Sequence, residues 1–362
     1  MLTKDFDYNL PRECIAQQPT IPRDHSRLMV VDKQTHQINH QRFFDILEHL
    51  QPGDVLVWNN SKVFKARLFG RLLSQNNQGL WEHQRDVEVF LVRPQENVGV
   101  WHVMAKPGKH VQNGTRVEFA PDFTCDVVAR KRDGTILVQF SDDEQTVREK
   151  ANKYGHIPVP LYVKDEPHEL ESYQTVYAKH EGSVAAPTAG FHFTQELIEK
   201  IKAKGVEFAE VTLHVGLGTF LPVKSENVED HTMHSEWVEV SEETAQKINR
   251  AKAVGRRVIA VGTTTVRTLE AVVRMTASLE KQTHGDDHHI RPHQGEINLF
   301  ILPGFEFKVV DALITNFHLP RSTLLMLISA FIGDTEFTLW CYNQAVAEKY
   351  RFFSFGDAMF IA

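Results

Sequence analysis

The sequence of 362 residues predicts an α/β fold: a largely parallel sheet flanked by helices, with an inserted antiparallel β-barrel domain. After residue 155, β-rich runs alternate with helix-length runs, which is typical of a parallel sheet covered by helices. Between about residues 60 and 140, short β-rich runs are separated by turn residues and no helical period appears. That pattern favours an antiparallel barrel or sandwich. The chain is also long for one domain, so two domains are expected.

The first 50 residues contain signals for a hairpin and a short helix. The hairpin is expected over residues 27–43, and the helix over residues 43–50 ends before a Pro-Gly pair. This segment is too short to fold alone, so we expect it to join the sheet of the second half of the chain.

The domain boundaries follow from this arrangement. Residues 61–149 are expected to form the inserted barrel domain, in which Asp133-Gly134 is a good hairpin turn. Residues 1–60 and 150–362 are expected to form one discontinuous α/β catalytic domain.

Strands and helices alternate through the second half of the chain. We expect helices from about Thr194 to Lys204, over 241–255, over 263–277 and from about Thr323, and β-rich runs at 182–187, 206–216, 256–262, 297–304 and 307–318. The segment 278–296 is polar and unpatterned, which indicates a surface loop.

The composition is that of a soluble globular protein, with 42% hydrophobic and 24% charged residues. No run approaches the roughly 18 apolar residues that span a bilayer, and the N-terminus lacks the apolar core of a signal peptide. The three cysteines lie far apart in the sequence, which excludes a disulfide framework and a Cys-x-x-Cys pair. A cytoplasmic protein is therefore expected. A monomer is our expectation for the oligomeric state, which the sequence itself does not encode.

The charge is unevenly distributed along the chain. Residues 62–132 hold 12 Lys or Arg and 7 Asp or Glu, a balance of +5, whereas the whole chain carries −7 and the remainder −12. A locally basic module in an acidic protein could bind one polyanion at one face.

Three strand-to-helix turns of the second half share an unusual density of hydrogen-bonding side chains. In an open parallel sheet, ligands bind beyond the carboxyl ends of the strands, where such turns lie. Helix N-termini there offer unpaired N–H groups to an anion. The turns supply the candidate ligand residues Thr188, Gly190, Thr263, Thr264, Arg267, Asn316, Arg321 and Ser322.

A fourth polar segment, LHVGLGTF, follows another strand. It contains His214 and the turn residues Gly216, Gly218 and Thr219, which favour close approach of the backbone to a ligand. The pattern is not Gly-x-Gly-x-x-Gly before a helix, and the Walker pattern is absent. An ordinary nucleotide-binding fingerprint therefore does not explain this site.

Histidines and a carboxylate near these turns are candidates for acid–base catalysis. The candidates are His192, His214, His231, His234, His318 and Glu236. The run EDHTMHSE, with His192 and His214, could instead bind zinc. Its spacing is generic and no zincin motif is present, so hydrogen-bonding or acid–base histidines are favoured and no metal is assigned.

Segments along nearly the whole chain carry a family resemblance. They are, in order, FDYNLPRECIAQQPTIPRDHSRLMVVD, YGHIPVPLY, YQTVYAKHEGSVAAPTAGFHFT, VTLHVGLGTF, EDHTMHSE, AVGTTTVRTLE, LFILPG, VVDALITNFHLPRSTLLMLISAF and YRFFSFGDAMFI. Together they resemble the S-adenosylmethionine:tRNA ribosyltransferase-isomerase family of queuosine biosynthesis. The chain departs from the family pattern at WNNSKVFKARL, at Leu217 and at Thr265.

The resemblance implies an enzyme that transfers the ribosyl part of S-adenosylmethionine to 7-aminomethyl-7-deazaguanine at the wobble position of a tRNA and isomerises it. Epoxyqueuosine-tRNA, adenine and methionine are then the products. S-adenosylmethionine is a co-substrate, and no prosthetic group is implied. The chain contains no Cys-x-x-x-Cys-x-x-Cys motif for an iron–sulfur cluster, so polar rather than radical chemistry is expected.

Roles for the candidate residues follow from this chemistry. A histidine could remove a hydrogen from the 5′ carbon, which the sulfonium acidifies, and Glu236 or Asp230 could take the proton of the attacking amine. Arg267 or Arg321 could hold the methionine carboxylate or a phosphate. The extruded base could stack on Phe191, Phe193, Phe220 or Phe317, although core packing suits most of these better.

The basic barrel is the candidate surface for the phosphates of the anticodon stem-loop. The residues expected there are Arg67, Arg71, Arg93, Lys106 and Lys109. Two alternatives stay open at this point: a histidine-based metallohydrolase, and a non-catalytic tRNA-binding module.

Overall fold

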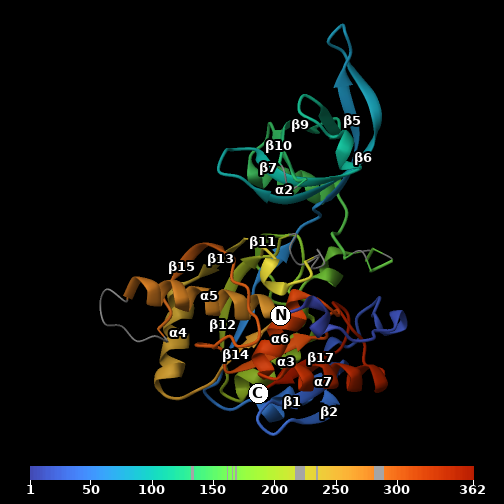
Figure 1. Cartoon of the computed structure of the whole chain (residues 1–362). Helices are drawn as coiled ribbons and strands as arrows, with labels where there is room; N and C mark the ends of the chain where they lie inside the picture. The colour runs from blue at the N-terminus through green and yellow to red at the C-terminus, as the bar shows by residue number, and fades with distance from the viewer. Residues whose placement is uncertain are drawn as a thin grey trace.

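The computed structural model describes residues 1–131, 134–160, 162–164, 166–167, 169–216, 225–233, 235–280 and 289–362, with no side-chain description for 277–280. It has two parts, a large α/β part and a six-stranded closed barrel that projects from it (Figure 1). The predicted fold class is confirmed.

The α/β part is built on a nine-stranded mixed sheet in the described chain. Its order is β15 (His293–Ile297), β13 (Glu236–Val240), β12 (Glu207–His214), β3 (Val55–Asn59), β14 (Val258–Val261), β16 (Ala312–Asn316), β17 (Ala358–Ile361), β1 (Arg27–Asp32) and β2 (Gln37–Arg42). The central strands β12, β3, β14 and β16 are parallel to one another. Antiparallel strands extend the sheet on both sides, and the N-terminal hairpin β1–β2 joins it as expected.

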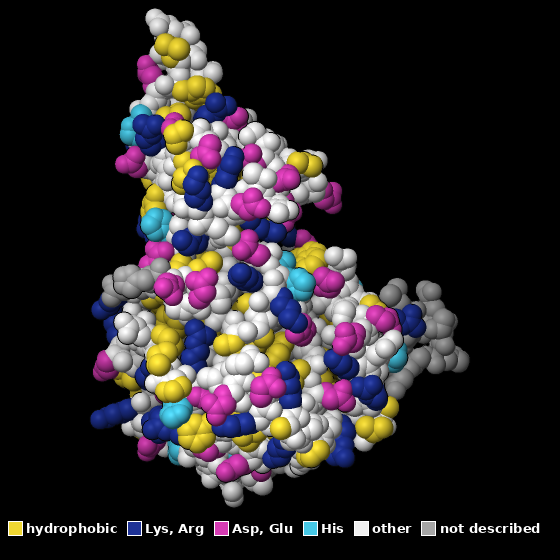
Figure 2. All heavy atoms as spheres, turned by 180° about the vertical axis from the view of Figure 1, so that it is seen from behind, with side chains coloured by type: hydrophobic (Ala, Val, Ile, Leu, Met, Phe, Trp, Pro, Cys, Tyr) yellow, Lys and Arg dark blue, Asp and Glu magenta, His cyan; other side chains and the backbone are white. Residues whose placement is uncertain are grey.

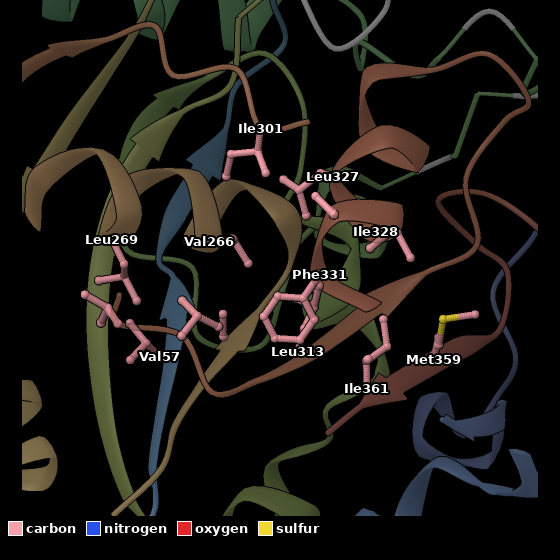
Figure 3. Close-up of a cluster of buried hydrophobic side chains, with 14 of the residues drawn as sticks. Val57, Val266, Leu269, Ile301, Leu313, Leu327, Ile328, Phe331, Met359 and Ile361 are labelled. Carbon is pink, nitrogen blue, oxygen red and sulfur yellow. The ribbon is translucent and has the colours of Figure 1, made fainter. Parts of the chain in front are cut away.

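The helices cover both faces of this sheet. They are α1 (Ile46–His49), α3 (Gln195–Ala203), α4 (Glu242–Ala253), α5 (Thr263–Glu280), α6 (Thr323–Ile332) and α7 (Thr335–Ala347). Side chains of β3 alternate between two cores, because successive residues of a strand point to opposite faces. Val57 packs with α5 and α6, whereas Leu56 packs with α3. Figure 3 shows the first of these cores, where Val266 and Leu269 of α5 and Phe331 of α6 lie over the sheet.

Three details differ from the sequence predictions. Residues 293–297 form the edge strand β15 instead of a loop, because an edge strand with an exposed face needs no apolar alternation. Residues 298–304 are not a strand, and α7 was not predicted.

The predicted Asp133-Gly134 turn lies only partly within the described residues, because Asp133 is outside them. Gly134 has a positive φ of +86°, which such a turn uses.

The barrel has the order β10 (Ile136–Phe140), β7 (Val100–Lys106), β6 (Trp81–Pro94), β5 (Arg67–Gln75), β8 (Arg116–Ala120) and β9 (Phe123–Arg130). Helix α2 (Glu144–Tyr154) follows β10, and its Val147 and Ala151 pack into the barrel core. This core is separate from the two cores on which β3 packs.

Two chain segments connect the barrel to the α/β part. Strand β4 (Ser61–Val63) leads into the barrel, and it pairs in parallel with β11 (His180–Ser183) after the return. On α2, Asn152 binds both connections: its Nδ2 donates to Glu181, and its Oδ1 accepts from the Lys65 N–H. In the described chain, no single helix is long and apolar enough to cross a membrane; α6 and α7 pass that criterion only as a pair, bent by 115°.

Candidate active site

Several of the candidate ligand residues lie at the carboxyl edge of the parallel strands. Because parallel strands end at the same edge of a sheet, the residues that follow β3, β12, β14 and β16 lie along one line. His214 ends β12, Gly262 follows β14, and Asn316 ends β16. With a strand spacing of about 4.8 Å, His214 and Asn316 are about 14 Å apart along the edge. Two groups of polar side chains form there.

The first group is a buried network around His192 and Asn316. Asn316 Nδ2 donates to His192 Nε2 at 3.2 Å, so the imidazole carries its hydrogen on Nδ1 and donates it to Ser26 Oγ at 2.7 Å. Thr188 Oγ1 donates to Asn316 Oδ1 at 3.3 Å. Burial, with the nearby charges of Arg351 and Arg23, lowers the pKa of His192 to about 3. His192 is therefore neutral and hydrogen-bonded on both ring nitrogens.

His192 lies on η7 (Thr188–His192), a short 3-10 helix whose packing requires a glycine. A Cβ on Gly190 would overlap the hydroxyl of Tyr177 and approach Thr175 Cγ2 to 2.7 Å. Tyr177 in turn stacks on Trp58 with ring centroids 3.9 Å apart. Gly190 is thus needed here for close packing against Tyr177.

His318 is buried, with a polar neighbour at each ring nitrogen. The Tyr342 hydroxyl lies 3.1 Å from its Nδ1, and the Thr315 hydroxyl lies 3.4 Å from its Nε2. Burial lowers the pKa of His318 to about 3. Tyr8 also donates to the His318 carbonyl at 2.5 Å, so this histidine is held on several sides.

The second group, which we call the junction cluster, consists of His214, Glu236, Trp237 and Arg267. Glu236 and Arg267 form a buried ion pair, with side chains 3% and 9% exposed. The Gly216 N–H donates to Glu236 Oε1 at 3.3 Å. Arg267 Nε donates to the Leu299 carbonyl at 3.0 Å, but its buried Nη2 has no partner in the described chain. One guanidinium nitrogen therefore has no acceptor among the described residues.

His214 stacks on Trp237 within this cluster, with ring centroids 5.2 Å apart and an interplanar angle of 14°. Its ring lies against the backbone of β11, since a Cβ on Gly182 would come within 2.7 Å of it. Burial, together with the charges of Arg148 and His180, lowers the pKa of His214 to about 4. Its buried Nδ1 has no hydrogen-bond partner among the described residues.

The first turn of α5 separates the two groups. Gly262 has a φ of +89°, which lets the chain turn from β14 into the helix. Thr263 and Thr264 open α5 at the edge, as the sequence predicted. Thr265 donates to the Val261 carbonyl at 2.8 Å and so closes the turn.

Arg321 and Ser322 have structural contacts in the described chain. Arg321 pairs with Asp7 on the surface, and Ser322 caps α6 by accepting from the Leu325 N–H at 3.2 Å. Both side chains therefore already have partners.

Other predicted residues lie apart or outside the described chain. The His231 ring contacts Phe300, and the neighbouring Glu229 binds the N-terminal amine. Gly218, Thr219, Phe220 and His234 fall outside the described residues. Within the described ranges, no three His, Cys, Asp or Glu side chains are grouped as metal ligands. Phe191, Phe193 and Phe317 are buried, as core packing requires.

The basic residues of the barrel divide into two classes. Arg67 pairs with Glu88 at 2.7 Å and Arg71 with Glu118 at 2.8 Å. Lys106 and Lys109 are exposed, and no ion pair is found for either in the described chain. The surface in Figure 2 accordingly mixes basic and acidic side chains over the barrel instead of showing one uniform basic patch.

Arg93 extends from the barrel to the α/β part, where it pairs with Glu296 of β15. Glu296 lies in register with Trp237, so the barrel contacts the strands that carry the junction cluster.

Sequence reasoning missed the roles of Asn59 and Asn60. Asn59 Oδ1 accepts from the Ser61 and Leu213 N–H groups, and Asn60 Oδ1 accepts from the Thr212 hydroxyl. These amides fasten β3 to β12 beside the site. Two asparagines directly after the apolar run VLVW were the signal that could have revealed them.

Comparison with known proteins gives concordant matches over the full length. The model of the family described as "Queuosine biosynthesis protein" matches residues 3–361. Proteins named S-adenosylmethionine:tRNA ribosyltransferase-isomerase from Thermotoga petrophila and Carboxydothermus hydrogenoformans are each 50% identical, with all of both chains covered. The crystal structure of S-adenosylmethionine tRNA ribosyltransferase from Thermotoga maritima is 40% identical and matches with a TM-score of 0.54, covering 99% of this chain and 100% of that one.

Proposed function

The chain belongs to the queuosine biosynthesis family of S-adenosylmethionine:tRNA ribosyltransferase-isomerases, and from this premise we propose how its residues carry the reaction. It is an enzyme of tRNA modification whose substrates are S-adenosylmethionine and tRNA. The observation that carries this conclusion is the 50% identity to relatives over the full length of both chains. The comparisons do not support the metallohydrolase and binding-module alternatives.

S-adenosylmethionine is proposed to lie along the carboxyl edge of the parallel strands. Asn316 and Thr188, held by neutral His192, supply hydrogen bonds at one end, and the first turn of α5 offers the N–H groups and hydroxyls of Thr263 and Thr264. The partnerless Nη2 of Arg267 is a suitable donor for the methionine carboxylate. Gly216, Gly218 and Thr219 remain proposed contacts from the neighbouring turn.

His214 is the proposed base that removes the 5′ hydrogen of the ribosyl group. It is the candidate whose Nδ1 has no partner in the described chain, whereas His192 and His318 have hydrogen-bonding neighbours at both ring nitrogens. Its lowered pKa keeps the ring in the neutral, proton-accepting form at pH 7. His231 and His234 remain alternative candidates for acid–base catalysis.

Glu236 is the proposed acceptor for the proton of the attacking aminomethyl group. The amine must be neutral to attack carbon, so a carboxylate at the edge assists the step. The ion pair with Arg267 fixes Glu236 in place and links this step to the binding of S-adenosylmethionine.

The tRNA is proposed to bind through its anticodon stem-loop, with the wobble base entering beside the junction cluster. Lys106 and Lys109 are exposed and suit phosphate contacts, whereas Arg67, Arg71 and Arg93 would have to exchange an ion-pair partner for a phosphate. We propose that residues 61–149 act as the inserted RNA-binding domain, and that residues 1–60 and 150–362 form the catalytic domain. We further propose that the protein is a monomer and works in the cytoplasm, where tRNA is modified.

The function is tested by incubating the protein with S-adenosylmethionine and an anticodon stem-loop that carries the aminomethyl-deazaguanine. Adenine and methionine should be released in equal amounts, and neither should appear with a stem-loop carrying guanine. Release with both stem-loops, or with neither, contradicts the proposal.

The role of His214 is tested separately by solvent exchange. Deuterium from D₂O should enter the 5′ position of S-adenosylmethionine with the wild type and not with His214→Ala. Equal incorporation by the two proteins removes His214 as the base.

A further inference from the structure

Arg148 lies on α2, the helix that closes the barrel, where the barrel meets the catalytic edge. The preceding residue, Val147, is buried in the barrel core together with Val184. The Val184 N–H donates to the carbonyl of Val215, the residue that follows His214 in the sequence. The segment that carries Arg148 is therefore linked to the segment that carries His214 through a shared hydrophobic core and one backbone hydrogen bond.

The guanidinium of Arg148 is only partly satisfied. Its Nε is buried and has no acceptor in the described chain. Its Nη2 pairs with Glu144, an exposed carboxylate one turn earlier on α2. The faces of Phe64 and Trp101 lie 5.9 and 5.8 Å from Cζ and restrict where the guanidinium can point.

These contacts do not account for a guanidinium whose side chain is only 18% exposed and whose Nε is buried. Its ion pair with Glu144, which is 47% exposed and four residues earlier on the helix, contributes little to stability. A buried N–H without an acceptor is costly, and a bound anion is one way in which a native protein satisfies such a group. The charge of Arg148 also acts on His214, where it adds to the effect of burial in lowering the pKa.

We propose that Arg148 binds a phosphate of the anticodon loop next to the wobble nucleotide, and so positions that nucleotide at the edge where His214 lies. The inference rests on the proposed function, and it adds a specific contact through which the inserted barrel takes part in catalysis. Arg148 is a positioning residue in this account.

An RNA phosphate fits better than the methionine carboxylate, the other anion of this reaction. Arg148 belongs to the segment that closes the barrel, not to the strand-end turns that surround the proposed S-adenosylmethionine site. A second barrel guanidinium, Arg93, reaches the same junction at Glu296, so the barrel presents two guanidinium groups on the side of His214 and Trp237. Arginine also presents two parallel N–H groups that match a phosphate.

The test uses Arg148→Met, which keeps much of the side-chain volume, Arg148→Lys, which keeps the charge, and Lys153→Met as a matched control. Lys153 lies on the same helix with its charge in solvent. Thermal unfolding of each variant checks that the fold is intact. Equilibrium binding of the stem-loop is measured without S-adenosylmethionine at several salt concentrations, and KM and kcat are measured for both substrates.

Arg148→Met should weaken stem-loop binding and raise the KM for the stem-loop roughly tenfold or more, as loss of a charge-assisted hydrogen bond predicts. The slope of log K against log salt should become shallower by about 0.7 to 0.9, the value of one lost phosphate contact. Arg148→Lys should restore the slope, and Lys153→Met should match the wild type.

An unchanged stem-loop affinity and salt slope in Arg148→Met overturns the proposal. A raised KM for S-adenosylmethionine with normal stem-loop binding also overturns it and assigns Arg148 to the methionine carboxylate instead. The binding measurement needs no turnover, so it tests the role of Arg148 even if the wild type releases no adenine. Absence of adenine release by the wild type would refute the proposed function and not the role of Arg148.

Discussion

The buried ion pair between Glu236 and Arg267 makes a quantitative test of the junction cluster possible. Glu236→Gln keeps an acceptor for the Gly216 N–H but removes the charge that faces Arg267. The guanidinium is then left 9% exposed with the Leu299 carbonyl as its remaining described acceptor. Breaking one side of a buried pair costs about 3–5 kcal/mol of unfolding free energy, and we expect a loss in that range.

Arg267→Met should cost about as much, because it leaves the Glu236 carboxylate buried with the Gly216 N–H as its remaining partner among the described residues. The double variant removes both charges, so its loss should be smaller than the sum of the two single losses by about 2–3 kcal/mol. Urea unfolding followed by tryptophan fluorescence measures all four proteins, with Trp237 adjoining the pair as a local reporter. Additive losses, within about 0.5 kcal/mol, would refute the reasoning.

The same variants separate stability from catalysis. The double variant should recover much of the stability and still release adenine at least 100-fold more slowly than the wild type, because both proposed catalytic and binding groups are gone. A double variant with near-normal activity would remove the pair from the mechanism.

Further expectations concern the packing and the buried titratable groups. Gly190→Ala should lower the free energy of unfolding by about 1–3 kcal/mol, as overpacking does. Adding Tyr177→Phe should recover part of that loss, because the Tyr177 hydroxyl causes the overlap. Equal melting temperatures for Gly190→Ala with and without Tyr177→Phe would contradict this. Glu270→Ala should lose at least about 3 kcal/mol in urea unfolding, since the buried carboxylate accepts from the N–H groups of residues 308–310 and pairs with Arg274; a loss under 1 kcal/mol would contradict it. The pKa values of His192 and His318 are lowered to about 3 in the folded protein. Between that pH and about 6.5, the unfolded chain therefore binds more protons than the folded chain. The free energy of unfolding should fall as the pH drops through this window, by up to about 1.4 kcal/mol per pH unit for each histidine. His318→Asn should make the slope of unfolding free energy against pH shallower by one such increment, and an unchanged slope between pH 6.5 and 5 would count against the neutral, buried state of this histidine.

The layers of the fold could be read from the sequence because they depend on local signals. Thr194, Ser241 and Ser322 cap the helices that follow them, and Gly205 follows the end of α3. The alternation after residue 155 reflects a sheet with two buried faces, as the split of β3 between two cores shows. Strand β15 was missed because it is polar and its pairing with β13 is a long-range contact.

The site was predictable as a location but not as a set of contacts. Strand-to-helix turns must meet at the carboxyl edge, so Asn316, Thr263 and His214 could be placed together from the sequence. The pairing of Glu236 with Arg267 joins residues 31 positions apart and depends on how α5 crosses β13. The position of Arg148 relative to His214 depends on how the barrel packs against the α/β part, which no local sequence pattern encodes. Tertiary packing decides both.

The central claim is that this edge transfers and isomerises a ribosyl group, and the mass of the wobble nucleoside tests it most directly. After reaction with S-adenosylmethionine, digestion of the stem-loop should give a nucleoside that has gained the epoxycyclopentanediol unit, with adenine and methionine released in equal amounts. The gain should appear at least 100-fold more slowly with Glu236→Gln/Arg267→Met. An unchanged nucleoside beside free adenine would show a hydrolase that cleaves S-adenosylmethionine without transfer, and would contradict the account.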